Sequence, residues 1–277
     1  MAIGLELGDD VGELRSRALI SLLLERLGQT DAHVRDALLA GEDRWWSYLC
    51  DQPECCSPAG TPIDPVISEE VAARFALAGV AKLANREAVL ALCAADPVRQ
   101  LTIHDCWGEV RRQRADRLAK AEHPGHEFER WRDEAIELVR DSLLGSARRT
   151  PEQESAILWA LCDVRVRDTV LWEIARSESH DAHRAYESAV ALLRAAPPGL
   201  IAPIGAVAAL LAWLIGDGVR AVAALDRVDA EDPNYALAEL LSRSISAGLP
   251  PAGWREMMQG LSREACRGRH RDAVPQA

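Results

Sequence analysis

The sequence predicts an all-α protein, an irregular multi-helix bundle of about ten helices. Two observations predict it. Apolar residues recur at helical spacing along most of the chain, and the segments that carry them open with capping residues and end at glycine. Strand signals are weak by comparison, because no run alternates β-branched with polar residues and no Asn-Gly pair marks a tight hairpin.

Two helices are expected near the N-terminus. The first covers residues 14–27, whose apolar side chains recur at helical spacing, and Gly28 ends it. The second covers residues 30–40, where Thr30 is a good N-cap and Gly41 follows the last helical residue. This part of the chain is therefore predicted to be helical.

The middle of the chain carries stronger helix boundaries. Ser68 is expected to cap a helix because two glutamates follow it at the positive end of the helix dipole. Residues 128–144 place apolar side chains on one stripe, and the helix is expected to end at Gly145. Thr150 precedes a proline at the first helical position and Gln153 at the capping-box position, which predicts a helix start.

Residues 209–234 read as two helices joined at Gly216–Gly218, with the small residue Ala221 where the two must approach closely. This pattern is similar to a single tetratricopeptide-type hairpin, with a third helix over residues 235–248. Residues 85–97 are a faint second copy. Because repeat arrays need several copies, we interpret the pattern as one helical hairpin within a bundle.

The proline-rich loop that ends at residue 65 is the predicted boundary between segments. Residues 1–65 are expected to form a short helical segment with a Trp/Cys-rich loop, and residues 66–266 a helical domain. Residues 267–277 are expected to be a disordered, basic tail. The formal net charge of -11 argues against a nucleic-acid partner or an anionic membrane surface, so a protein is the expected partner.

The first residues lack the basic region and the apolar run of a signal peptide. The most apolar stretch, residues 200–215, is shorter than the ~20 residues that cross a bilayer and is expected to be a buried helix. We therefore expect a cytoplasmic protein. Thiols stay reduced there, so the seven cysteines are not expected to form a disulfide framework.

The stretch WWSYLCDQPECC holds the densest chemistry in the chain: Trp45, Trp46, Tyr48, Cys50, Cys55 and Cys56. Our first interpretation is packing, in which the aromatic side chains are structural anchors, at least one tryptophan is buried, and the cysteines act as small apolar residues. The second is a redox pair between Cys50 and Cys55 or Cys56. Pro53 favours a turn that brings two sulfurs together, while Cys56 is expected to point elsewhere.

A metal site is the third interpretation of the same cysteines. Zinc takes four ligands in a tetrahedron, typically from separated Cys pairs, and adjacent cysteines rarely both bind one ion. The fourth ligand would come from a distance, with His104 or Cys106 as candidates. No cofactor is predicted, and zinc is the ion expected if the cluster binds a metal.

Six motifs in the same order resemble a family of uncharacterised actinobacterial proteins known as a domain of unknown function: RWWSYLC at 44–50, CCSPAGTP at 55–62, WLIGDG at 213–218, AALDR at 223–227, DPNYALA at 232–238 and GLPPAGW at 248–254. The first motif, with the double cysteine after it, is the family hallmark. The resemblance covers residues 14–256 and implies no activity. The family usually carries an α/β segment before the hallmark and a proline after the double cysteine, where this chain has Ser57. The chain thus resembles the C-terminal part of the family.

No phosphate loop, dinucleotide fingerprint or nucleophile elbow occurs, so the sequence leaves enzyme status open. The function favoured at this point is a helical protein-interaction module that uses the surface beside Gly216. Two alternatives stay open. One is a redox- or metal-responsive protein acting through the three cysteines, and the other is an enzyme fragment that lacks its α/β segment.

Overall fold

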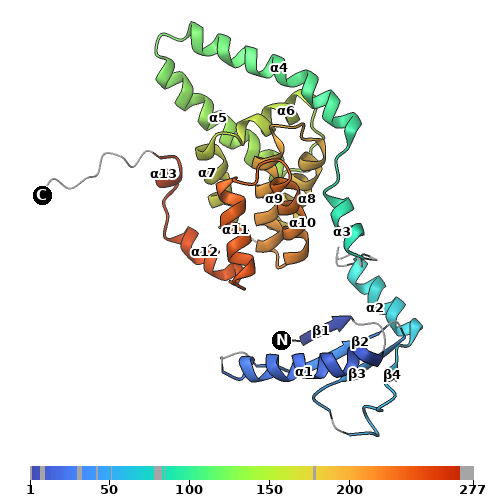
Figure 1. Cartoon of the computed structure of the whole chain (residues 1–277). Helices are drawn as coiled ribbons and strands as arrows, with labels where there is room; N and C mark the ends of the chain where they lie inside the picture. Colours follow the sequence, from blue (N-terminus) through green and yellow to red (C-terminus); the bar gives the residue numbers. More distant parts are fainter. Residues whose placement is uncertain are drawn as a thin grey trace, which may run out of the picture. The chain divides into compact units, whose positions relative to one another are not determined.

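The computed structural model describes residues 2–6, 10–29, 33–41, 43–50, 52–77, 83, 85–176 and 179–268. Within these ranges, only the backbone is described at residues 2–6, 10–16, 76 and 179–180. The chain forms two compact units, residues 1–82 and 83–277 (Figure 1). The division between units falls after residue 82, whereas the sequence placed it after residue 65.

The N-terminal unit begins with a β-α-β unit. Strand β1 (Ala2–Glu6) leads into helix α1 (Asp10–Leu27), and strand β2 (Asp36–Ala40) then pairs with β1 in parallel (Figure 1). A helical connection is what a parallel pair requires. The expectation that this chain lacks an α/β segment ahead of the Trp–Cys motif is therefore corrected.

The helix predicted over residues 30–40 is wrong for residues 36–40, which form β2; residues 30–32 lie outside the described residues. The sequence DALLA has good helix formers, but Ala37 and Leu39 alternate into the core of this unit. The strand is also hydrogen-bonded on both edges, to β1 and to β3 (Arg44–Ser47). These non-local contacts override the local helix propensity.

The sheet has the order β1-β2-β3-β4, in which β3 pairs antiparallel with β2 and with the short strand β4 (Thr61–Pro62). Helix α2 (Pro65–Leu77) follows. Asp64 Oδ1 accepts a hydrogen bond of 2.8 Å from the backbone N–H of Val66. Asp64 therefore caps the helix, whereas the cap was predicted at Ser68. The helix begins at Pro65, four residues before the start at Glu69 that a cap at Ser68 implies.

The C-terminal unit is helical. The predicted all-α bundle of about ten helices is confirmed as a mostly helical fold, and the sheet of the N-terminal unit is the part that the prediction lacked. The elements of the C-terminal unit are α3 (Arg86–Leu92), α4 (Pro97–Lys120), α5 (Pro124–Leu144), α6 (Pro151–Ala160), α7 (Val164–Ala175), α8 (Ser179–Ala195), α9 (Ile201–Leu214), α10 (Gly218–Asp229), α11 (Ala236–Ser246), α12 (Pro251–Gln259) and α13 (Arg263–Cys266). The capping box predicted at Thr150 is confirmed, because Thr150 and Gln153 bond each other's backbone N–H groups.

Helix α9 lies at the centre of this unit, in contact with α7, α8, α10, α11 and α12 (Figure 1). Every residue from Ala202 to Leu214 is buried. The apolar stretch at 200–215 is thus a core helix, as predicted. In the part of the chain that the structure describes, no helix is both long enough and apolar enough to cross a membrane.

Helices α9 and α10 form the predicted hairpin. Gly216 takes a positive φ of +85°, and Asp217 caps α10 by accepting a hydrogen bond of 2.9 Å from the N–H of Arg220. Gly205, near the start of α9, packs against Val228, near the end of α10, so the helices run antiparallel. Ala221 is fully buried, as expected.

The predicted tail begins inside the helical unit. Arg267 is 7% exposed and forms an ion pair with Asp133, and its backbone carbonyl accepts a hydrogen bond of 2.8 Å from Arg165 Nη1. The chain is therefore part of the fold through Gly268. The remainder of the predicted tail, residues 269–277, lies outside the described residues.

The contact between Gly205 and Val228 predicts that Gly205→Ala destabilises the protein. An added Cβ at Gly205 would overlap Val228 Cγ2, so the free energy of unfolding should fall by ~1–3 kcal/mol in urea titrations. Gly108→Ala, in the middle of α4 with no atom within 4 Å of the added Cβ, is the control and should stabilise by up to ~1 kcal/mol.

Adding Val228→Ala to Gly205→Ala should recover part of the loss, measured as a coupling of at least ~0.5 kcal/mol in a double-mutant cycle. A Gly205→Ala variant as stable as Gly108→Ala would show that the two helices do not meet at this point.

Candidate functional site

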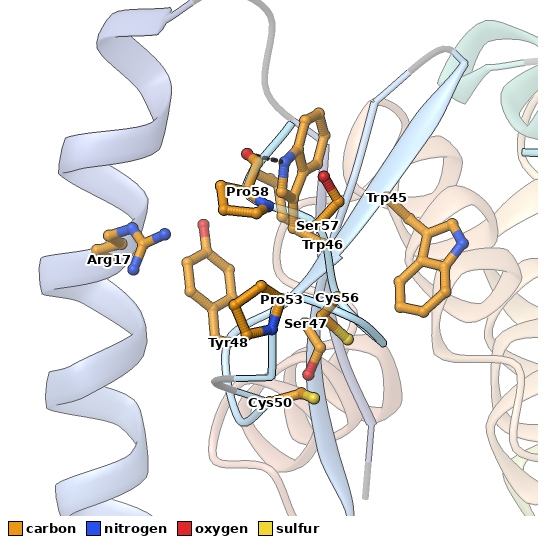
Figure 2. Close-up of a pocket in the computed structure, with 11 residues that line it drawn as sticks. Arg17, Trp45, Trp46, Ser47, Tyr48, Cys50, Pro53, Cys56, Ser57 and Pro58 are labelled. Atoms are coloured by element: carbon orange, nitrogen blue, oxygen red, sulfur yellow. Dashed lines mark hydrogen bonds between the residues drawn. The ribbon is translucent and has the colours of Figure 1, made fainter. Parts of the chain in front are cut away.

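A small cavity of about 150 Å³ lies in the N-terminal unit, next to the Trp–Cys stretch (Figure 2). Its walls come from α1, β2, β3 and the loop between β3 and β4. The lining residues include Arg17, Leu39, Trp46, Tyr48, Cys50, Pro53, Cys56 and Pro58. The helix and the second strand of the β-α-β unit thus meet β3 and the cysteine loop at one place.

Strand β3 directs its aromatic side chains to different sides. Figure 2 shows Trp46 and Tyr48 on one side of the strand and Trp45 on the other, as the alternation of a strand requires. All three are half-buried, and none belongs to the buried core of the unit. The prediction that Trp45 or Trp46 is a buried anchor is therefore not met, and these side chains instead form walls of the cavity.

Trp46 ties the end of the cysteine loop to the sheet. Its indole N–H donates a hydrogen bond of 3.3 Å to the carbonyl of Pro58. The indole also packs against Gly60, where an added Cβ would lie 2.5 Å from the ring, and Gly60 has a positive φ of +81°. Arg44 Nη1 donates to the carbonyls of Ala59 and Gly60 at 3.1 and 3.0 Å. Strand β3 therefore fixes residues 58–60.

A tight turn brings the three cysteines of the loop together. The carbonyl of Gln52 accepts hydrogen bonds from the N–H of Cys55 at 3.1 Å and from that of Cys56 at 2.7 Å, and Pro53 presets the turn. The sulfurs of Cys50, Cys55 and Cys56 all lie within 4.8 Å of one another. The prediction that the sulfur of Cys50 lies close to that of Cys55 or Cys56 is confirmed.

The expectation that Cys56 points elsewhere is wrong, because its sulfur lies 3.9 Å from that of Cys55. In an extended strand two successive side chains would point to opposite faces. Here both N–H groups bond one carbonyl, so the backbone curls and the two side chains converge. This curl is a property of the turn, which residue spacing alone does not reveal.

The sulfurs influence one another electrostatically. Hydrogen bonding to Cys50 raises the pKa of the Cys56 thiol to about 12, with further contributions from loss of water and from the hydrogen bond to Cys55. At neutral pH the Cys56 side chain is therefore a thiol, and thiols are weak nucleophiles. A bound cation would reverse this preference, because metal coordination deprotonates thiols outright.

The cluster has the donor chemistry and spacing of a thiophilic metal site. Metal–sulfur bonds of about 2.3 Å in a tetrahedron place neighbouring sulfurs ~3.8 Å apart, and the sulfurs of Cys55 and Cys56 are 3.9 Å apart. Among the residues that the structure describes, no histidine, aspartate or glutamate joins the three cysteines as a further ligand. The described part of the chain thus offers three ligands.

The two residues predicted as a fourth ligand lie on α4 in the helical unit. There the His104 ring makes an edge contact with Trp107 at 6.3 Å between centroids, and Cys106 Sγ lies 3.9 Å from Glu152 Oε1. Loss of water raises the pKa of the Cys106 thiol, and the carboxylates of Glu152 and Asp105 raise it further.

No motif in the sequence indicated the wall of the cavity that α1 and β2 form. Arg17 comes from α1, with its guanidinium carbon 5.7 Å from the centre of the Tyr48 ring, and Leu39 comes from β2. Figure 2 shows the Arg17 side chain directed toward Tyr48. These residues join the site through the pairing of β2 with β3, which sequence analysis did not predict.

The contact between Gly60 and Trp46 predicts that Gly60→Ala destabilises the N-terminal unit by ~2–4 kcal/mol, since the positive φ and the overlap with the indole both oppose a side chain. Gly216→Ala is the control, because Gly216 has a similar φ of +85° and no atom within 4 Å of the added Cβ. It should lose only ~1–2 kcal/mol. Equal losses in urea titrations would contradict a tight contact with Trp46.

Comparisons with known proteins place the chain in a family. No curated protein and no solved structure matches it significantly. Residues 2–252 match the family model described as "Domain of unknown function (DUF4192)", which covers the β-α-β unit, the cysteine loop and most of the helical unit. The predicted resemblance to a domain of unknown function is thereby confirmed. The chain belongs to the DUF4192 family.

Proposed function

We propose that this chain is a metal-responsive protein whose N-terminal unit binds a zinc-class ion through Cys50, Cys55 and Cys56. The observation that supports the proposal is the convergence of three sulfurs within 4.8 Å in a loop held by its own turn. Thiolates are soft ligands, and they select zinc(II) and copper(I) over harder ions such as magnesium and calcium. Metal binding is thus favoured over packing and over redox chemistry as the role of these cysteines.

A metal ion accounts for the cluster better than a disulfide does. A disulfide joins two sulfurs at about 2.05 Å and leaves the third without a role. One metal ion uses all three, and the 3.9 Å between the sulfurs of Cys55 and Cys56 already matches a tetrahedral edge. Metal binding therefore requires less rearrangement of the loop than disulfide formation does.

The three thiols that the described residues offer favour a responsive site over a purely structural one. Structural zinc sites are closed by four protein ligands, whereas sites with three protein ligands keep a fourth position for exchange. A reducing compartment suits such a site because thiolate ligands must escape oxidation. This requirement supports a cytoplasmic location. The hallmark motif, together with positive charge carried almost entirely by arginine, supports an actinobacterial source.

The proposal predicts that full-length protein purified with a reductant and loaded with zinc retains about one zinc ion per chain after desalting, as measured by elemental analysis. Cys50→Ser, Cys55→Ser and Cys56→Ser should each lower the zinc content strongly, because each removes a thiolate. Cys162→Ser removes a thiol from the helical unit and is the matched control, so its zinc content should equal that of the wild type.

A free-thiol count on the same samples separates the alternatives. Loss of two thiols on mild oxidation, with no zinc retained under reducing conditions, would show that the cysteines form a redox pair and not a metal site. Loss of zinc in Cys106→Ser or His104→Ala would contradict an open fourth position, because it would show that α4 supplies the last ligand.

A second candidate function is protein interaction by the helical unit, and a groove beside the hairpin favours it. The groove lies between α3, α10 and α11, has a volume of about 380 Å³ and is mainly apolar. Val219 and Val222 line it and are 64% and 36% exposed. The ion pair of Arg86 with Asp226 at 3.3 Å forms a polar rim. An apolar groove with a polar rim suits an amphipathic helix of a partner protein.

This candidate predicts that Val219→Glu abolishes association with the partner while leaving the fold intact, since the side chain is exposed. Val98→Glu is the control, because Val98 on α4 is 74% exposed and lies outside the groove. The measurement is in-cell crosslinking of the wild type and both variants. If a protein crosslinks to the Val219→Glu variant as strongly as to the wild type, the groove is not the surface that binds it.

A further inference from the structure

The helical unit contains a cavity of about 220 Å³ between α4, α5 and α6. Its wall is largely apolar and includes Trp131 and Leu138 from α5 and Trp159 from α6. Arg114 lines the same cavity from α4. The cavity shares no lining residue with the groove beside the hairpin, so it is a separate feature of this unit.

Three aromatic rings surround the guanidinium of Arg114. Its central carbon lies 3.3 Å from the centre of the Trp131 ring and 4.7 Å from the centres of the Phe128 and Trp159 rings. Stacking on a ring uses the flat face of a guanidinium, whereas the N–H groups point outward in its own plane. The rings therefore fix the position of the cation without accepting its hydrogen bonds.

The donors of Arg114 are free to bind a ligand. In the part of the chain that the structure describes, Arg114 donates no hydrogen bond and forms no ion pair; its contacts are those with the three rings. Its nitrogens are not among the buried atoms that lack a partner, so they remain accessible. Loss of water lowers the pKa of this guanidinium, and the nearby charge of Asp163 opposes the effect only in part. A bound anion would replace the lost water.

The charges around the cavity favour an anion. Of the described residues that line it, three are charged: Arg114, Arg117 and Glu134. Arg117 and Glu134 neutralise each other in an ion pair of 2.9 Å, and Arg117 also binds Glu127. Arg114 therefore supplies the positive charge that no carboxylate of the wall neutralises.

We propose that this cavity binds a small aromatic carboxylate, with the carboxylate on the N–H groups of Arg114 and the ring against the apolar wall. A planar carboxylate matches the fork of a guanidinium and accepts two parallel hydrogen bonds. Trp131 and Trp159 favour a ligand ring, because aromatic rings attract one another in offset or edge-to-face arrangements. The inference involves none of the three clustered cysteines, so it is independent of the proposed metal site.

The size of the cavity limits the ligand to about one ring. A water molecule occupies about 30 Å³ in the liquid, so a volume of about 220 Å³ corresponds to roughly seven water molecules. Drug-sized ligands occupy larger cavities, of ~300–1,000 Å³. Benzoate, a single ring with one carboxylate, is therefore the probe. Benzamide has nearly the same shape without the charge and is the matched control ligand.

The test titrates full-length protein with benzoate and, separately, with benzamide, and measures both affinities by ligand-observed NMR. The wild type should bind benzoate roughly tenfold or more tightly than benzamide, because a charged hydrogen bond is stronger than a neutral one. Arg114→Gln should remove most of this preference. Arg111→Gln is the control, since Arg111 is exposed on α4, lies over the Trp107 ring and is outside the cavity, and it should keep the preference.

A second variant tests the cavity without altering the cation. Ala156 of α6 lines the cavity and is half-buried, so Ala156→Leu should fill part of the space and weaken the binding of both ligands at least tenfold. This variant decides the question if circular dichroism shows that Arg114→Gln is unfolded. The inference is overturned if the wild type binds benzoate no better than benzamide, if folded Arg114→Gln keeps the preference, or if Ala156→Leu binds benzoate as the wild type does.

Discussion

Burial of α9 on every side is the constraint on which the helical unit depends. A helix with thirteen consecutive buried residues, Ala202–Leu214, has no face that water can solvate. It must be surrounded, and helices from both directions along the chain contact it. Close approach then requires small side chains at the contacts. Gly205 meets Val228 across the hairpin, and Ala221 is fully buried in α10.

Local signals were sufficient to predict the helical unit and insufficient for the N-terminal unit. Thr150 and Gln153 define a helix start through contacts within one turn, so residue spacing reveals it. Residues 36–40 contain no β-branched residue, and their strand conformation depends on pairing with β1 and β3. Pairing partners are a tertiary property, which local propensity does not encode.

The candidate site likewise depends partly on contacts that are local in the sequence and partly on contacts between distant residues. The sequence indicated the cysteines and placed Cys50 near the Cys55–Cys56 pair, because Pro53 favours a turn between them. It did not predict convergence of all three sulfurs, since that depends on two N–H groups sharing the carbonyl of Gln52. Arg17 could not be predicted either, because the fold of α1 against the sheet brings it to the cavity.

The attachment of the loop to β3 gives the cluster its chemical significance. Tyr48 N–H bonds the carbonyl of Ala37 at 2.8 Å at one end, and Trp46 holds Pro58 and Gly60 at the other. Fixing both ends of a loop lowers the entropy that ligand binding must remove. The sulfurs of Cys55 and Cys56 are then at a tetrahedral spacing of 3.9 Å before any ion binds, so less binding energy is spent on ordering the loop. Trp46 lies outside the buried core, and its contribution is to hold the loop in which the three thiols converge.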